Sequence, residues 1–119
     1  LATYINDLGV PICTRYMSPQ IESMLGYPVS RWLEPDFYDE ILHPDDRPRV
    51  MAEVERTHRT GENFKLEYRL IHADGSIVHV LDETVAVRDD EYRPIMRQGY
   101  FVDITDRRSQ RASLRPAAS

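Results

Sequence analysis

The sequence predicts a single α+β domain in which an antiparallel sheet carries helices on one face. Three observations support this class. The 119 residues suffice for one hydrophobic core. Apolar residues follow helical spacing between about residues 18 and 60, and they alternate with polar residues from residue 63 onward. Because strands and helices are segregated along the chain, the strands are expected to pair antiparallel beneath the helices.

The chain is expected to begin with a hairpin of two short strands. Residues 1–5 mix apolar and β-branched side chains, and residues 6–9, Asn-Asp-Leu-Gly, form a turn-favouring set. The returning strand is predicted over residues 12–17. Pro11 belongs at its start, because proline donates no hydrogen bond to a strand ladder.

Three short helices are predicted next. Ser18 is expected to cap the first helix, Pro19 suits its first position, and Gly26 suits the left-handed conformation at its end. Two further short helices are expected around residues 30–33 and 36–42.

Asp45 or Asp46 is expected to cap the longest predicted helix, which runs to about residue 60. Pro48 falls in its first turn, where a missing backbone amide costs little stability. Gly61 follows its end and marks the return to extended chain.

Three antiparallel strands complete the predicted sheet. Apolar side chains alternate with charged ones in the first of them, which is typical of a strand with one buried face. Asp74-Gly75 is a strong hairpin turn signal before the second strand. The three strands are predicted at residues 63–70, 77–88 and 95–105.

The composition argues against several classes of protein. A net charge of −5 disfavours nucleic-acid binding. The apolar runs are too short to span a bilayer, so no direct membrane contact is expected. The single cysteine, Cys13, fits a reducing compartment, and we expect a cytoplasmic location. Because the first residue is Leu1 and not Met, the chain is expected to be part of a longer protein.

Four segments stand in a definite order along the chain. They are Tyr16-Met17-Ser18-Pro19-Gln20-Ile21 with Leu25-Gly26-Tyr27; Leu42-His43-Pro44-Asp45-Asp46-Arg47; Glu67-Tyr68-Arg69-Leu70 with Asp74-Gly75; and Gly99 with Asp103-Ile104-Thr105-Asp106-Arg107. In this order they resemble the PAS family, in the bacterial sensory-box subgroup that carries a C-terminal PAC motif. Two departures are a longer segment between Gly9 and Tyr16, and His79 where many relatives carry tryptophan.

The resemblance implies a five-stranded antiparallel sheet of order 2-1-5-4-3, with short helices over its concave face and a pocket between them. It divides the chain into a sensor domain at residues 1–106 and the start of a signalling linker at residues 107–119. Domains with this fold sense light, redox state, gases or small metabolites, or they only dimerise. The fold alone does not choose among these functions.

The resemblance also predicts where a ligand binds. Leu66, Tyr68 and Leu70 are expected to face the helices together with Gly99 and Phe101 of the last strand. A glycine facing a cavity leaves room, and the Tyr68 hydroxyl among apolar walls suits a small, partly apolar ligand. A solidly filled core is the alternative.

Two further sites are predicted on the last strand and just after it. Met96, Tyr100, Val102 and Ile104 are expected to face outward, and so apolar a sheet face predicts a homodimer or a covering helix. Signal output is predicted to run through Asp103, Thr105 and Arg107, where the strand continues toward the next domain.

No cofactor is expected. A flavin–cysteine adduct requires an Asn-Cys-Arg motif that the chain lacks, and Cys13 is interpreted as a small apolar filler. A haem would need His58 as its axial ligand, but a histidine near a helix end is commonly structural. His43, His58, His72 and His79 lack the spacing of a metal site.

The sequence thus predicts a sensory module that binds a small ligand or dimerises. It is expected to regulate a fused output domain: a histidine kinase, a diguanylate cyclase or phosphodiesterase, or a transcription regulator. The alternative is a dimerisation scaffold without a ligand. The domain itself is not expected to be an enzyme, since the sequence shows no nucleophile elbow and no phosphate-binding glycine loop.

Overall fold

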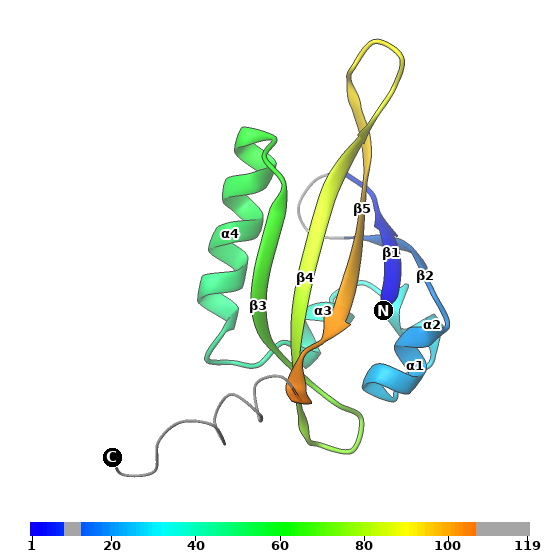
Figure 1. The fold of residues 1–119 in the computed structure, drawn as a ribbon, viewed down its shortest axis with the longest axis vertical. Helices are drawn as coiled ribbons and strands as arrows, with labels where there is room; N and C mark the ends of the chain where they lie inside the picture. The colour runs from blue at the N-terminus through cyan, green and yellow to red at the C-terminus, as the bar shows by residue number, and fades with distance from the viewer. Residues whose placement is uncertain (9–12, 107–119) are drawn as a thin grey trace.

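A computed structural model describes residues 1–8 and 13–106 of the chain and shows one five-stranded antiparallel sheet (Figure 1). The strand order is β2-β1-β5-β4-β3, as predicted. The strands are β1 (Ala2–Asn6), β2 (Thr14–Met17), β3 (Phe64–Ile71), β4 (Ile77–Arg88) and β5 (Pro94–Asp103). The hairpin of β1 and β2 from the start of the chain thus pairs with β5, the last of the three strands that follow the helices.

Four helices lie between β2 and β3 in the sequence and pack against one face of this sheet (Figure 1). They are α1 (Gln20–Leu25), α2 (Val29–Trp32), α3 (Phe37–Ile41) and α4 (Arg47–Thr60). The predicted α+β class and the segregation of helices from strands are both confirmed. None of the described helices has both the length and the apolar character needed to cross a bilayer.

Glycines end two of the helices, as the sequence predicts. Gly26 after α1 and Gly61 after α4 both adopt positive φ, at 82° and 78°. At Gly26 a side chain is excluded for a second reason, because a Cβ there would lie 2.6 Å from the ring of His72. The end of α1 is thereby fixed against the turn between β3 and β4.

Asp46 occupies the predicted N-cap position of α4, but neither it nor Ser18 caps its helix through a side-chain hydrogen bond. Ser18 makes no side-chain cap for α1; its hydroxyl accepts the backbone N–H of Thr3 at 2.9 Å and so ties the chain to β1. Asp46 precedes α4 without capping it through its side chain, because its carboxylate binds Arg69 on β3 instead. Both side chains link a helix start to the sheet, which a local sequence motif does not reveal.

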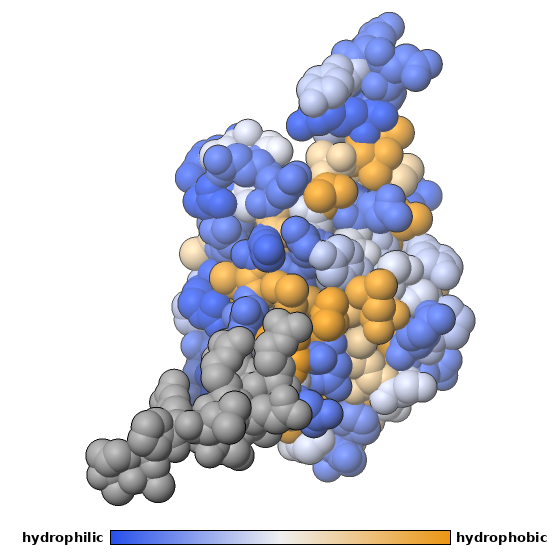
Figure 2. Space-filling view, in the orientation of Figure 1, coloured by the Kyte–Doolittle hydropathy of each residue, from blue (hydrophilic) through white to orange (hydrophobic). Residues whose placement is uncertain are grey.

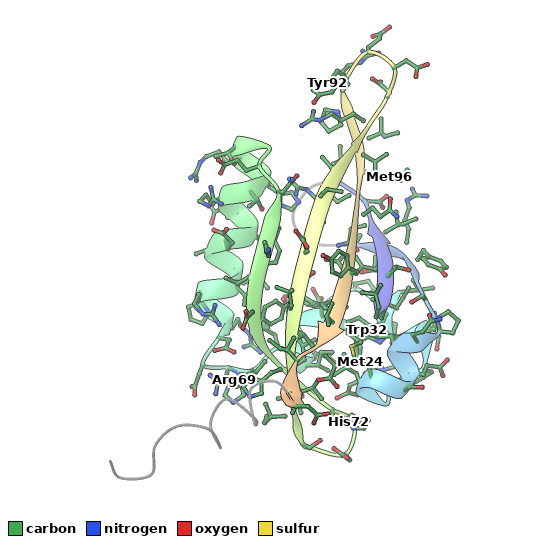
Figure 3. The ribbon with its side chains drawn as sticks, viewed as in Figure 1. Met24, Trp32, Arg69, His72, Tyr92 and Met96 are labelled. Carbon is green, nitrogen blue, oxygen red and sulfur yellow. The ribbon has the colours of Figure 1, made fainter. Side chains whose placement is uncertain are left out.

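The Asp46–Arg69 pair closes the junction between α4 and β3. Both carboxylate oxygens of Asp46 accept from the guanidinium, at 2.8 and 2.9 Å, and the Arg69 backbone N–H donates to the same carboxylate at 2.9 Å. Arg69 lies at the end of β3 that adjoins the start of α4 (Figure 3). This guanidinium holds the pKa of the Asp46 carboxyl down at about 2, mainly through its hydrogen bonds.

The core fills the space between the helices and the concave face of the sheet. Aromatic rings dominate one side of it, where the Phe37 and Trp32 rings meet edge to face with centroids 5.3 Å apart. Phe101 of β5 lies beside both Trp32 and Tyr4, at 5.9 and 5.0 Å. The most deeply buried apolar side chains include Ile21, Leu25, Leu42, Val50, Leu70 and Val80. Each contributes about 1.5 to 3 kcal/mol of hydrophobic stabilisation.

Candidate functional site

A small cavity lies inside the domain, between the concave face of the sheet and the helices. Its volume is about 40 Å³. The side chains that surround it come from all five strands and from α2, α3 and α4, and they include Tyr4, Asn6, Trp32, His58, Asp82 and Arg97. Pockets for drug-sized ligands are several times larger. In this conformation the cavity therefore suits only a small molecule.

A buried carboxylate, Asp82 of β4, forms one side of the cavity. It is 5% exposed and accepts hydrogen bonds from two phenols, Tyr4 on one oxygen and Tyr68 on the other, the latter at 2.6 Å. The Tyr4 hydroxyl also bonds the hydroxyl of Thr84, and the Tyr68 hydroxyl bonds that of Tyr38. Five polar side chains from β1, α3, β3 and β4 thus form one continuous network.

The network sets the protonation of its members. Burial raises the pKa of the Asp82 carboxyl to about 6, although the hydrogen bonds from Tyr4 and Tyr68 act in the opposite direction. Burial also raises the pKa of both phenols well above 10, so they remain donors. No arginine or lysine forms an ion pair with Asp82 among the described residues. The carboxylate is held by neutral hydroxyls alone.

A buried cation, Arg97 of β5, lines another part of the cavity. The residue is 5% exposed, and its Nη2 donates to the Thr57 carbonyl oxygen at 3.0 Å. Its Nε is buried without a hydrogen-bond partner, and no carboxylate within the described chain forms a salt bridge with it. Burial lowers the pKa of the guanidinium. Because arginine does not deprotonate in proteins, a nearly uncompensated positive charge lies in the interior.

Two more unmatched polar atoms belong to the same cavity. Asn6 Oδ1 and Trp32 Nε1 are buried and have no partner within the described part of the chain. Asn6 lies directly opposite Arg97 in the pairing of β1 with β5. Buried polar groups are normally hydrogen-bonded, so each exception calls for an explanation. All three unmatched atoms found in residues 1–8 and 13–106 belong to side chains around this one cavity.

His58 of α4 also lines the cavity. Its Nδ1 lies 2.8 Å from the Val54 carbonyl oxygen, one helical turn earlier. A carbonyl only accepts, so Nδ1 carries the proton and Nε2 remains the second ring nitrogen available for interaction. This bond to the backbone agrees with the structural role expected for a histidine near the end of a helix.

The predicted pocket residues are placed on the expected face of the sheet, but most do not line the cavity. Phe101 does line it, and Tyr68 lies one hydrogen bond behind, through Asp82. Leu66 and Leu70 belong to the apolar core beside the cavity. Of the five residues predicted on β3 and β5 to contact a ligand, Phe101 is thus the one that lines this cavity.

The prediction that Gly99 leaves room for a ligand is wrong. A Cβ at Gly99 would lie 2.5 Å from Cζ and the hydroxyl oxygen of Tyr4, its partner in the pairing of β1 with β5. It would also lie 2.7 Å from the Glu83 carbonyl oxygen. The missing side chain makes room for the Tyr4 ring and so lets Tyr4 reach Asp82.

The sequence interpretation missed the two buried charged residues of the cavity, Asp82 and Arg97. Asp82 gave no clear signal, because β4 is apolar at both alternating positions and its inward face could not be assigned. Arg97 did give one. Since Gly99 and Phe101 were placed inward, the two-residue period of a strand also turns Arg97 inward.

The predicted dimer face is only partly open. Met96, Tyr100 and Val102 of β5 are half-buried, whereas Ile104 is 3% exposed and lies outside the main core cluster. Ile104 follows the end of β5, where its N–H donates to the His79 carbonyl oxygen at 2.9 Å, so it does not belong to the open surface. Figure 2 shows apolar side chains gathered over the strands, interrupted by polar ones. Met96 projects from the upper part of β5 in Figure 3.

The predicted output residues close the end of β5 onto β4. The Thr105 hydroxyl accepts the His79 backbone N–H at 3.0 Å, and the Asp103 carboxylate accepts the Thr105 N–H at 2.9 Å. Arg107 lies outside the described residues. The predicted role of Cys13 as a buried filler is wrong, because its side chain is exposed just before β2.

A five-stranded antiparallel sheet covered on one face by short helices, with a small cavity between the two layers, places the domain in the α+β class. Comparison with known proteins gives the family. The family profile described as the PAS fold matches residues 14–101. The chain belongs to the PAS family, and it is of the sensory-box type found in bacterial signalling proteins. PAS domains are sensory modules and not catalysts.

Known relatives are parts of signalling proteins. The N-terminal domain of a diguanylate cyclase with a PAS/PAC sensor from Marinobacter aquaeolei is 27% identical, with a TM-score of 0.79, and the match covers 91% of this chain and 99% of that domain. A sensory box histidine kinase/response regulator from Burkholderia thailandensis is 26% identical, with a TM-score of 0.68, over 95% of this chain and 85% of that structure.

A third relative is the methyl sulfide methyltransferase-associated sensor of Methanosarcina acetivorans. It is 35% identical over 72 residues, which is 60% of this chain. The match spans only 7% of the length of that relative. The resemblance therefore concerns one sensory domain within a much larger protein.

Proposed function

We propose that the domain senses a small ligand in its interior cavity and uses the occupancy of that cavity to regulate a fused output domain. The observation that carries this proposal is the gathering of three unmatched polar atoms, from Asn6, Trp32 and Arg97, around one small space. In a scaffold with a filled core these atoms would only destabilise the folded state, because each buried polar atom without a partner carries a free-energy penalty. A bound ligand supplies the missing partners.

The strand that borders the cavity also leads out of the domain. Arg97 and Phe101 line the cavity on β5, and Asp103 and Thr105 close the end of that strand. A ligand that binds one arrangement of β5 better than another shifts the population of the two, and only that difference in affinity does so. We expect the shift to reach the residues that follow Thr105.

The proposed output is an attached signalling domain in the cytoplasm. The similar domains from Marinobacter and Burkholderia belong to a diguanylate cyclase and to a histidine kinase/response regulator. We therefore favour an output of one of these kinds, with a transcription regulator as a further option. The fold and the cavity are compatible with all three outputs.

A cavity-filling substitution in the intact protein tests the proposal. Val54 of α4 lines the cavity, and Val54→Phe adds a ring to that wall. We expect output activity, whether autophosphorylation or nucleotide cyclisation, to lose its dependence on the cellular ligand. Glu55→Gln, on the exposed side of the same helix, is the matched control. Unchanged regulation in a folded Val54→Phe protein refutes sensing through this cavity.

Homodimerisation is a second proposed function, supported by the outer face of the sheet. Val85 of β4 is 41% exposed there, beside the half-buried Met96 and Tyr100 of β5. An apolar sheet face of this kind is commonly covered by a partner. Light scattering is expected to show a dimer that Val85→Lys dissociates. A wild-type domain that stays monomeric at tens of micromolar speaks against this face as an interface.

A further inference from the structure

We infer that the ligand of the cavity is a small monocarboxylate whose carboxylate group binds the guanidinium of Arg97. The inference rests on the proposed function, because it assumes that the cavity takes a ligand, and it adds the chemical class of that ligand. It follows from the charge, the unmatched atoms and the size of the cavity.

The charge of Arg97 is the first step. Several arginines of this domain have carboxylate partners, including Arg31 with Glu34, Arg56 with Glu53 and Arg69 with Asp46. The side chains of these three arginines are 32 to 44% exposed, whereas the residue Arg97 is 5% exposed and is paired with no carboxylate of the described chain.

The immediate surroundings of Arg97 offer little compensation. Its one hydrogen bond runs to a neutral carbonyl, that of Thr57, and Arg88 is a nearby like charge. Two carboxylates also line the cavity, but neither forms a salt bridge with Arg97. Asp7 is paired with Arg15 and its side chain is 43% exposed, and Asp82 accepts hydrogen bonds from Tyr4 and Tyr68. Burying an unpaired ion is unfavourable, so we expect an anion that enters from outside to stabilise the folded domain.

The shape of the guanidinium selects the kind of anion. Nη2 is already used by Thr57, while Nε is buried and unmatched. The guanidinium is planar, and its parallel N–H groups match the two oxygens of a carboxylate. A carboxylate oxygen is therefore the expected partner of Nε.

The other two unmatched atoms, on Asn6 and Trp32, are expected to form hydrogen bonds with the rest of the ligand. Asn6 lies opposite Arg97 on the neighbouring strand, so its unmatched Oδ1 can accept a hydrogen bond from a hydroxyl group next to the carboxylate. The indole N–H of Trp32 is a donor and needs a second acceptor. The ring of Phe101 beside Trp32 provides an apolar wall for the hydrocarbon part.

The size and the opposite charge of the cavity limit the ligand further. A volume of about 40 Å³ corresponds to roughly three or four water molecules, which suits an acid of two or three carbon atoms. Asp82 lies in the same cavity and is largely ionised at pH 7, since its pKa is about 6. A second carboxylate on the ligand would be repelled by this negative charge. Monocarboxylates are therefore favoured over dicarboxylates.

Titration calorimetry on the 119-residue chain tests the inference. The ligands are acetate, propionate, lactate and pyruvate, and each acid is compared with its neutral amide, with chloride and phosphate as simple anions. We expect at least one acid to bind at least tenfold more tightly than its amide and than either simple anion. Arg97→Gln is expected to lose at least tenfold in affinity for that acid.

Two variants control for damage to the fold. Arg93→Gln removes a charge from an exposed arginine of the same hairpin, 69% exposed in its side chain, and is expected to leave the affinity unchanged. Arg97→Lys keeps the positive charge but loses the planar fork, so an intermediate affinity is expected. Circular dichroism confirms that each variant is folded before titration.

The outcomes separate this inference from the proposed function. Equal binding of acid and amide, or retention of affinity by Arg97→Gln, overturns the carboxylate assignment while leaving a ligand-binding cavity in place. Binding of chloride or phosphate as tightly as the acids also overturns it. If neither acids nor amides bind, the inference fails, and the output assay with Val54→Phe still decides whether the cavity senses another molecule.

Discussion

Two arginines of this domain lie in contrasting surroundings, and the contrast separates a structural site from a functional one. At the junction of α4 and β3, Arg69 donates twice to the carboxylate of Asp46, and the charges cancel. In the cavity, Arg97 of β5 is more deeply buried and is paired with no carboxylate of the described chain. The Asp46–Arg69 ion pair stabilises the fold, whereas the guanidinium of Arg97, which has no carboxylate partner, marks the site where we expect a ligand to bind.

The two buried carboxylates show the same contrast. Asp46 is stabilised in its ionised form by a guanidinium, which lowers its pKa to about 2. Asp82 is surrounded by hydroxyls, and burial raises its pKa to about 6. The first carboxylate favours folding when it is charged, and the second favours folding when it is neutral. The two regions therefore respond to pH in opposite directions.

The largest effect is expected from breaking the complete pair. Asp46→Ala leaves Arg69 without its partner and removes the acceptor of the Arg69 backbone N–H. We expect the free energy of unfolding to fall by about 3 kcal/mol, measured by urea denaturation. Asp45→Ala changes the exposed neighbour and is expected to alter it by less than about 0.5 kcal/mol. Equal effects of the two substitutions contradict a structural role for the pair.

A smaller effect is expected from the pH dependence of the cavity. The folded-state pKa of Asp82 is raised, so its contribution to stability is full below about pH 4 and is lost as the pH rises through 6. This loss amounts to about 2 kcal/mol between pH 4 and 7. Asp46 acts in reverse, because its stabilisation is present above pH 4 and is lost as the pH falls toward 2.

Asp82→Asn isolates the contribution of the cavity carboxylate. The variant is expected to remove the decline in unfolding free energy between pH 4 and 7 while keeping the loss below pH 4. Glu83→Gln, the adjacent residue on the opposite face of β4, serves as the control and is expected to keep the decline. A decline of the same size in Asp82→Asn shows that another group is responsible.

The smallest effect concerns the exit from the domain. Thr105→Val removes the acceptor of the His79 N–H and is expected to cost about 1 kcal/mol. In the intact protein we expect this change, or Asp103→Ala, to alter the output while ligand affinity stays nearly constant. Thr60→Val, at the exposed end of α4, is a control for the loss of a threonine hydroxyl. If output is regulated normally in both Thr105→Val and Asp103→Ala, this junction does not transmit the signal.

The fold could be predicted from the sequence because its signals are local and repeated. The alternation from Phe64 to Leu70 and the Asp74-Gly75 turn each fix an element without knowledge of the rest. The sheet order came from the family resemblance, which the structure confirms. Local patterns and a known topology together were sufficient for the architecture.

The site could be predicted only in part, because it depends on contacts between distant segments. Asp82 binds Tyr4, 78 residues away in the chain, and nothing near either residue indicates this pairing. Gly99 was interpreted as free space, since the sequence does not show that the ring of Tyr4 fills it. Arg97 was accessible from the period of β5 and was overlooked. The buried polar side chains Tyr4, Asp82 and Arg97 can be placed together only when the pairing of the strands is known.

The unfolding free energy of Arg97→Gln, measured beside that of wild type in buffer free of small carboxylates, tests the account most directly. If the charge of Arg97 is uncompensated in the empty domain, its removal leaves the stability unchanged or raises it, and a bound acid then stabilises the wild type alone. A loss as large as that of Asp46→Ala would instead show that the interior already satisfies this arginine, and the contrast between the two regions would fail.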